Sequence, residues 1–174
     1  MQPQPHKLVL LAAGSVDQVG TLLAQAASPL ASVLGRSLAA PLPSEHPSRS
    51  LALLHDSPNG EESVLAPLPI DPGCSLADGS CWAEALGAWR QPAVLLLTTD
   101  QQNSGLPAAM VALLAQKRVP LAGLVQWGRP WLPELRRREG LPWLGALDDT
   151  ALDGCGLPLA LAMSCASLDV GVGR

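Results

Sequence analysis

Short, uninterrupted apolar runs recur along the chain and alternate with segments of helical periodicity. Six of these runs have the length of strands that are buried on both faces, as in a parallel sheet. They occupy residues 8–13, 51–54, 64–68, 93–98, 121–126 and 143–147. Apolar positions three and four apart predict helices over residues 17–34, 76–89 and 106–118, with Pro29 breaking or kinking the first.

This alternation of strands and helices predicts an α/β fold with a doubly wound, mostly parallel sheet and helices on both faces. Residues 36–50 are rich in Pro and Ser and are expected to form a loop. A short helix is expected to begin near Pro133, and a last one to cover residues 157–168. With 174 residues and no internal repeat, the chain is expected to form one domain over residues 1–174.

The first apolar run leads into a glycine-bearing segment, GSVDQVGTL, which starts at Gly14 and opens the first helix. A strand, a glycine turn and a helix N-terminus form the layout of a phosphate-binding loop. The candidate nucleotide-contacting residues are therefore Gly14, Ser15, Val19, Gly20 and Thr21. Three interpretations stay open: a plain glycine turn, a retained anion or nucleotide site, and a catalytic loop.

Taken in order, these segments resemble dethiobiotin synthetase, an ATP-dependent enzyme of biotin synthesis among the P-loop NTPases. The family's phosphate loop has a Gly, five residues and then Val-Gly-Lys-Thr across the turn, and Gly14 and Gly20 fit the glycine spacing. Residues 51–60 and 64–68 resemble its strand ending in Glu-Gly-Ala-Gly-Gly and the Val-Pro-Leu that follows. Residues 119–125 and 140–147 resemble its later strands, which read Pro-Val-Ala-Gly-Val-Val and Val-Pro-Leu-Leu-Gly.

The resemblance implies a P-loop NTPase-like three-layer sandwich that works as a dimer with ATP and Mg²⁺. The implied reaction forms dethiobiotin from diaminononanoate, ATP and CO₂. In this alignment Asp56 takes the place of a glutamate on the metal side of the site, so Asp56 is the candidate metal ligand. Trp127 takes the place of an asparagine that reads adenine, so Trp127 is a further candidate nucleotide-binding residue.

The chain departs from the family where the chemistry is carried out. Thr21 stands where the family has the phosphate-binding lysine, and Leu22 stands where it has the Mg²⁺-ligating hydroxyl. Trp127 can stack on a base but cannot read its edge. The family's substrate segment, which contains a Lys, is missing here, and Arg36 and Arg49 are the cations in its place.

Composition and charge narrow the classes of function. The net charge is −4, so no general attraction to nucleic acid or to an anionic membrane is expected. No apolar run reaches the roughly 18 residues that span a bilayer, and no signal peptide is expected, which favours a cytoplasmic protein. The four cysteines match no zinc or redox spacing and are expected to be buried or half-buried thiols. They are Cys74, Cys81, Cys155 and Cys165.

Two further stretches are candidates for binding. Residues 127–131 read WGRPW, and two Trp around an Arg fit a stacking platform for a base, a protein contact, or a cap over a sheet edge. Residues 136–138 are three consecutive Arg. They are expected to form the solvated end of a short helix, with a phosphate patch as the alternative.

The sequence thus predicts a non-catalytic dethiobiotin-synthetase-like domain that acts in binding or regulation, with another protein or a second copy of itself as partner. One alternative is a divergent, ATP-dependent dethiobiotin synthetase. Another is a nucleotide sensor that binds without hydrolysis. Whether ATP and Mg²⁺ bind at all stays open at this stage.

Overall fold

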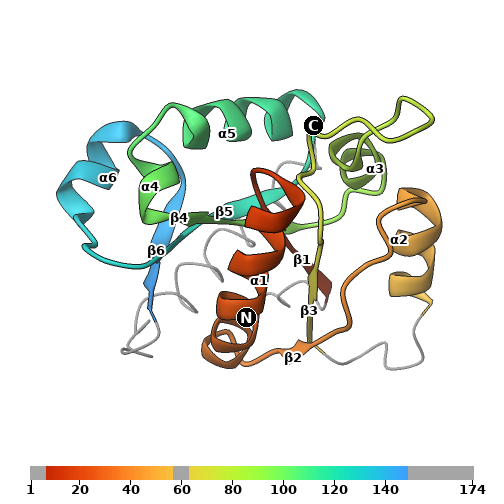
Figure 1. The fold of residues 1–174 in the computed structure, drawn as a ribbon, viewed down its shortest axis with the longest axis horizontal. Helices are drawn as coiled ribbons and strands as arrows, with labels where there is room; N and C mark the ends of the chain where they lie inside the picture. The colour runs from red at the N-terminus through yellow and green to blue at the C-terminus, as the bar shows by residue number, and fades with distance from the viewer. Residues whose placement is uncertain (1–6, 57–62, 149–174) are drawn as a thin grey trace, which may run out of the picture.

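A six-stranded sheet in which all strands are parallel forms the centre of the computed structural model, which describes residues 7–56 and 63–148. The strand order in space is β2-β3-β1-β4-β5-β6 (Figure 1). The strands are β1 (Lys7–Ala12), β2 (Ser37–Leu38), β3 (Val64–Pro67), β4 (Ala93–Thr98), β5 (Leu121–Trp127) and β6 (Trp143–Leu147). The predicted doubly wound α/β fold is confirmed.

Helices cover both faces of this sheet. The helices are α1 (Val16–Val33), α2 (Pro47–His55), α3 (Trp82–Ala88), α4 (Thr99–Gln102), α5 (Leu106–Gln116) and α6 (Pro133–Glu139). One core cluster lies between α1 and the sheet, and a second lies between the other face and α2, α3 and α5 (Figure 1). Alternate residues of β1 enter the two clusters, with Leu8 and Leu10 on one side and Val9 and Leu11 on the other. All four are fully buried, which explains why this strand reads as a continuous apolar run.

Helix α1 begins at Val16, directly after the turn, because a reciprocal pair of side-chain hydrogen bonds caps its N-terminus. The Ser15 hydroxyl accepts a hydrogen bond from the Gln18 amide, and the Gln18 side chain accepts one from the Ser15 amide, which together form a capping box. Pro29 does not break the helix predicted over residues 17–34, and α1 continues past it to Val33.

The prediction of a strand over residues 51–54 is wrong, because these residues lie in α2. Pro47 occupies the first turn of that helix, where its missing amide hydrogen costs nothing. Leu51 is fully buried while Leu53 is 61% exposed, a helical alternation that a doubly buried strand would not show. Four apolar residues in a row cannot distinguish a strand from one face of a helix.

Smaller differences separate the predicted from the observed elements. The predicted loop over residues 36–50 contains the two-residue strand β2 and the start of α2, and α4 was not predicted. The helix expected over residues 76–89 begins only at Trp82. The helix expected over residues 157–168 lies outside the described residues.

The order of the strands creates a crevice at the carboxyl end of the sheet. After β1 the chain passes through α1 to the edge strand β2, whereas after β4 it passes through α4 and α5 to β5 on the opposite side. Strands β1 and β4 are neighbours, so their outgoing connections diverge between them. Open α/β sheets bind ligands at such a switch point.

Candidate functional site

The turn after β1 is shorter than a phosphate-binding loop. Gly14 has φ +122°, and a Cβ atom built on it would lie 2.6 Å from Gln18 Oε1, so this position requires glycine. Only Ser15 separates Gly14 from the first residue of α1. Gly20 lies inside α1, where an added Cβ atom would have nothing within 4 Å apart from the adjoining helix backbone. The glycine pair therefore does not enclose a loop, and the open cradle that its spacing implies is absent from this turn.

The amides that begin this turn bond to the protein itself. The Gly14 amide donates to Asp71 Oδ2 at 2.8 Å, and the Ser15 amide donates to Gln18 Oε1 at 2.9 Å. A phosphate loop instead keeps these donors for the ligand. The Asp71 carboxylate thus accepts the hydrogen bond from the Gly14 amide that a bound anion would otherwise accept.

Asp71 is the site residue that the sequence interpretation missed. It follows β3 by four residues, and β3 lies directly beside β1, so its side chain reaches the Gly14 turn from the neighbouring strand. Its second oxygen, Oδ1, accepts a hydrogen bond from the Gly73 amide at 2.8 Å. The available signal was an Asp-Pro-Gly turn shortly after the predicted strand over residues 64–68, but the family resemblance placed the carboxylate of the site at Asp56 instead.

A pocket of about 420 Å³ opens at the switch point between the N-terminal parts of α1 and α4. We call it the switch-point pocket. It is lined by Asp17, Gln18, Thr21, Leu22, Gln25, Thr98, Asp100 and Gln101. Gln101 Nε2 donates to the Ala13 carbonyl at 2.7 Å, which ties α4 to the end of β1. None of these lining residues, all within the described part of the chain, is Lys or Arg, and two are Asp.

The predicted nucleotide-contacting residues separate into three groups. Thr21 lines the switch-point pocket, and Gly14 and Ser15 form the turn beside it. Val19 is fully buried in the core beneath α1, so its side chain cannot contact a ligand. Gly20 is exposed on α1, but it is not among the residues that line the pocket.

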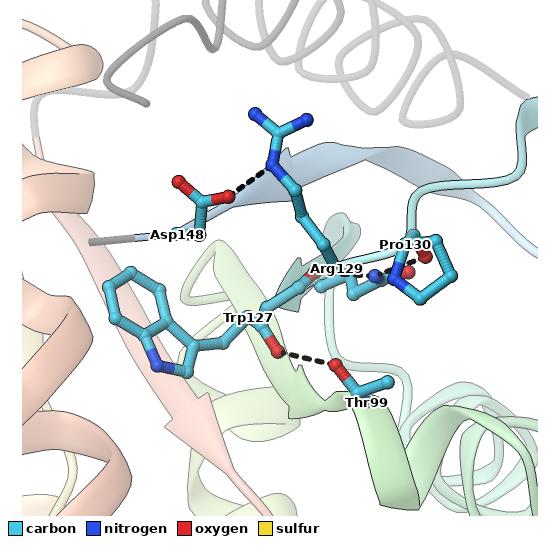
Figure 2. Close-up of polar contacts among 7 residues, drawn as sticks. Thr99, Trp127, Arg129, Pro130 and Asp148 are labelled. Atoms are coloured by element: carbon cyan, nitrogen blue, oxygen red, sulfur yellow. Dashed lines mark hydrogen bonds and ion pairs between the residues drawn. The ribbon is translucent and has the colours of Figure 1, made fainter. Parts of the chain in front are cut away.

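Trp127 ends β5 and pairs with Thr98 of β4, which lines the switch-point pocket, but Trp127 is not itself a lining residue. Its ring packs half-buried against the core cluster beneath α1, and its carbonyl accepts a hydrogen bond from Thr99 Oγ1 at 3.2 Å. In the loop that follows, Arg129 forms an ion pair with Asp148, which comes after the neighbouring strand β6. Figure 2 shows the indole and this ion pair at the ends of the two strands. The indole is therefore a packing residue in this conformation.

The stretch of residues 127–131 does not form a single stacking platform. Trp131 instead meets Trp143 of β6 edge to face, with ring centroids 6.1 Å apart. The guanidinium carbon of Arg136 lies 5.1 Å from the centre of the Trp143 ring, and Arg136 pairs with Glu139 at 2.5 Å. Arg136 is consequently buried, contrary to the prediction that residues 136–138 are all solvated, whereas its two arginine neighbours are exposed.

Asp56 does not lie where a metal-side carboxylate was expected. It follows the last residue of α2 and is exposed, because the segment before it is a helix and not a strand. The end of α2 lies at the start of β1, where Lys7 Nζ donates to the His55 carbonyl at 2.7 Å. Asp56 is thus beside the amino end of the sheet, whereas Gly14 is at the carboxyl end.

The fold does not bring together the positions that the resemblance assigns to Mg²⁺. Within residues 7–56 and 63–148, no group of three or more His, Cys, Asp or Glu side chains comes together. Leu22, which the resemblance aligns with a metal-ligating hydroxyl, is 3% exposed and packs in the core. Of the two cysteines in these ranges, Cys81 is half-buried as predicted and Cys74 is exposed, and both are free thiols.

Comparison with protein families and with curated proteins found no match. Within the described ranges, none of the helices combines the length and apolar character that a bilayer crossing requires.

Proposed function

We propose that this chain is a non-catalytic dethiobiotin-synthetase-like domain that acts in binding or regulation and not in phosphoryl transfer. The observation that carries the proposal is the 2.8 Å bond from the Gly14 amide to the Asp71 carboxylate. A phosphate at this turn would have to displace a carboxylate of the chain. It would then meet the neutral hydroxyl of Thr21, which supplies no charge-assisted hydrogen bond.

The charge of the switch-point pocket supports the same proposal. Asp17 and Asp100 both line it, and no lining residue in the described part of the chain is a cation. Phosphoryl transfer relies on a cation and on Mg²⁺ to offset the charge that spreads over the transferring group. Two carboxylates at this position would repel a nucleoside triphosphate in both its ground and its transition state.

The partner that we propose is another protein or a second copy of the chain. Leu132 and Leu135, at the start of and within α6, are 47% and 42% exposed, and they lie close in sequence to the half-buried ring of Trp131. Neighbouring exposed apolar side chains of this kind are common in interfaces. Sedimentation of the wild type and of Leu135→Asp tests whether the partner is a second copy of the chain. If the wild type sediments as a monomer, the proposed partner is a different protein.

Calorimetric titration with ATP tests the non-catalytic proposal directly. We expect no heat of binding up to about 5 mM nucleotide, with or without Mg²⁺, which corresponds to a binding free energy weaker than about −3 kcal/mol. The Asp71→Asn variant keeps an acceptor for the Gly14 amide but loses the charge. We expect Asp71→Asn to remain unable to bind Mg²⁺–ATP, because Thr21 still supplies no cation.

Each other outcome identifies one of the alternatives. Binding of ATP that does not depend on Mg²⁺ would support a nucleotide sensor. Formation of dethiobiotin from diaminononanoate, ATP and CO₂ by the purified chain would overturn the proposal in favour of a divergent synthetase. Thr21→Ala provides the control for that assay, because activity from a contaminating enzyme would be unaffected by it.

A further inference from the structure

A groove between α2 and α3 has a volume of about 680 Å³, which is within the range of small-molecule sites. One wall consists of the N-terminal part of α2, with His46, Ser48 and Arg49. The other wall consists of the turn before α3 and α3 itself, with Asp78 and Glu84 among its residues. We call this feature the α2–α3 groove. It shares no lining residue with the switch-point pocket.

The α2 wall is positive. Helix α2 has nine residues, and its N-cap residue, His46, makes no side-chain hydrogen bond to the first amides of the helix. The first turn also contains no acidic residue. These amides and the helix dipole therefore favour a negative ligand group. Arg49, in the same turn, takes part in none of the ion pairs of the described residues and adds a full positive charge to this wall.

The opposite wall carries a carboxylate that stays ionised. Asp78 Oδ1 accepts hydrogen bonds from the Ser80 hydroxyl at 2.6 Å and from the Ser80 amide at 2.9 Å. These bonds lower the pKa of Asp78 below its ordinary value. Glu84 is already paired with Lys117 at 2.6 Å, so Asp78 is the carboxylate on this wall that no cation of the described chain contacts.

Hydrogen bonds hold the two walls in place without a ligand. Trp82, which is fully buried at the start of α3, donates from Nε1 to the Ser44 carbonyl at 2.8 Å, in the segment that leads into α2. The Ser50 hydroxyl donates to the Pro43 carbonyl at 2.7 Å and fixes that segment to α2. A site whose walls are held in this way loses less conformational entropy when a ligand binds.

We propose that the α2–α3 groove binds a small zwitterion of the amino-acid type, with its carboxylate at Arg49 and the α2 N-terminus and its ammonium group at Asp78. A simple anion would be attracted by Arg49 but repelled by Asp78. A simple cation would be attracted by Asp78 but repelled by Arg49. A ligand with one charge of each sign satisfies both walls. This inference is independent of the proposed function, because no residue of the switch-point pocket takes part in it.

The test uses L-alanine as the probe, together with two blocked forms of the same molecule. N-acetylalanine lacks the ammonium group, and alanine amide lacks the carboxylate. Titrations followed by amide chemical shifts, up to about 50 mM ligand, cover weak binding. We expect alanine to bind at least about tenfold more tightly than either blocked form, because each lacks one charge-assisted hydrogen bond.

Variants separate the two walls. Arg49→Gln is expected to weaken alanine binding by about tenfold or more while leaving the binding of alanine amide, which has no carboxylate, as tight as before or tighter. Asp78→Asn is expected to weaken alanine binding similarly while leaving the binding of N-acetylalanine, which has no ammonium group, as tight as before or tighter. Arg49→Lys should restore part of the lost affinity. Arg138→Gln and Glu134→Gln, both exposed on the distant α6, are the matched charge controls and should bind alanine as the wild type does.

Three results would overturn the proposal. They are the absence of any shift with alanine, equal affinity for alanine and either blocked form, and equal weakening by the α6 controls. Near-ultraviolet circular dichroism of the tryptophans confirms that each variant is folded. Because ATP titration uses a different pocket, either proposal can fail while the other holds.

Discussion

At the scale of single residues, the Gly14 turn depends on a carboxylate that is distant in sequence. Asp71 lies 57 residues further along the chain, yet it accepts the Gly14 amide bond with one oxygen and the Gly73 amide bond with the other. Gly14 is half-buried, so its amide has limited access to a replacement partner in water. Asp71 therefore contributes both to the stability of the turn and to the negative charge beside the switch-point pocket.

The first prediction concerns the stability that this carboxylate provides. Asp71→Ala removes a charged acceptor from two amides and is expected to lower the free energy of unfolding by about 1.5–3 kcal/mol. Asp71→Asn keeps an acceptor and should cost less. Urea denaturation measures both, and Glu45→Ala, at an exposed position, is a control expected to change stability by about 0.5 kcal/mol at most. Equal stabilities of Asp71→Ala and the control would contradict the role assigned to the carboxylate.

At the scale of elements, two helical glycines have opposite surroundings. Gly87 is buried in α3, and a Cβ atom on it would lie 1.7 Å from the Lys117 carbonyl oxygen, where the chain leaves α5. Gly20 lies on the exposed side of α1, and an added Cβ would meet open space. The first glycine allows two elements to approach closely, whereas the second only weakens its own helix.

The second prediction compares these glycines in one experiment. Gly87→Ala is expected to destabilise the protein by about 3 kcal/mol, because the clashing atom belongs to the backbone and cannot rotate away. Gly20→Ala is expected to stabilise it by about 0.5–1 kcal/mol, since alanine favours the helix. Thermal and urea unfolding measure both changes. A destabilising Gly20→Ala would indicate that Gly20 belongs to a strained loop, and would reopen the phosphate-loop interpretation of this segment.

The elements also show which parts of the structure can be predicted from the sequence. Strands β4 and β6 match the predicted residues because their runs are apolar and bounded by turn residues. Residues 51–54 were assigned wrongly because four apolar residues fit a strand and a helix face equally well. The bond from Gly14 to Asp71 depends on β3 lying beside β1, and no local pattern encodes that neighbourhood. The glycine turn was thus predicted at the end of the first strand, where Gly14 lies, while the carboxylate that binds it was not found.

At the scale of the whole molecule, the two ends of the sheet have different roles. The carboxyl end carries the Gly14 turn and the switch-point pocket. At the amino end, Gln91 is 1% exposed and joins three segments. Its amide nitrogen donates to the Lys7 carbonyl at 2.8 Å and to the Pro92 carbonyl at 3.0 Å. Its oxygen lies 2.9 Å from His55 Nε2, and the His55 ring stacks on Trp89.

These contacts determine which atom donates in each hydrogen bond of the Gln91 side chain. Because the Gln91 nitrogen already donates to two carbonyls, its oxygen faces His55, and His55 Nε2 is the donor between them. Through this arrangement the end of α2 is attached to the start of β1 and to the start of β4. The amino end of the sheet is therefore closed by a structural hydrogen-bond network, which leaves the carboxyl end as the open one.

The third prediction tests this network as a unit. Gln91→Ala leaves buried partners unsatisfied and is expected to lower the free energy of unfolding by about 2 kcal/mol, with an unchanged dependence on urea concentration. Gln116→Ala, at an exposed position at the end of α5, is the matched control and should have little effect. Combining Gln91→Ala with His55→Ala in a double-mutant cycle should give a coupling of about 1 kcal/mol, because both residues share one bond. Strict additivity would show that α2 is held to the sheet by apolar packing alone. The Gln91→Ala variant can also be titrated with alanine, whose affinity for the α2–α3 groove should fall only if the whole of α2 shifts. An unchanged affinity together with a lower stability would show that Gln91 acts only at the amino end of the sheet.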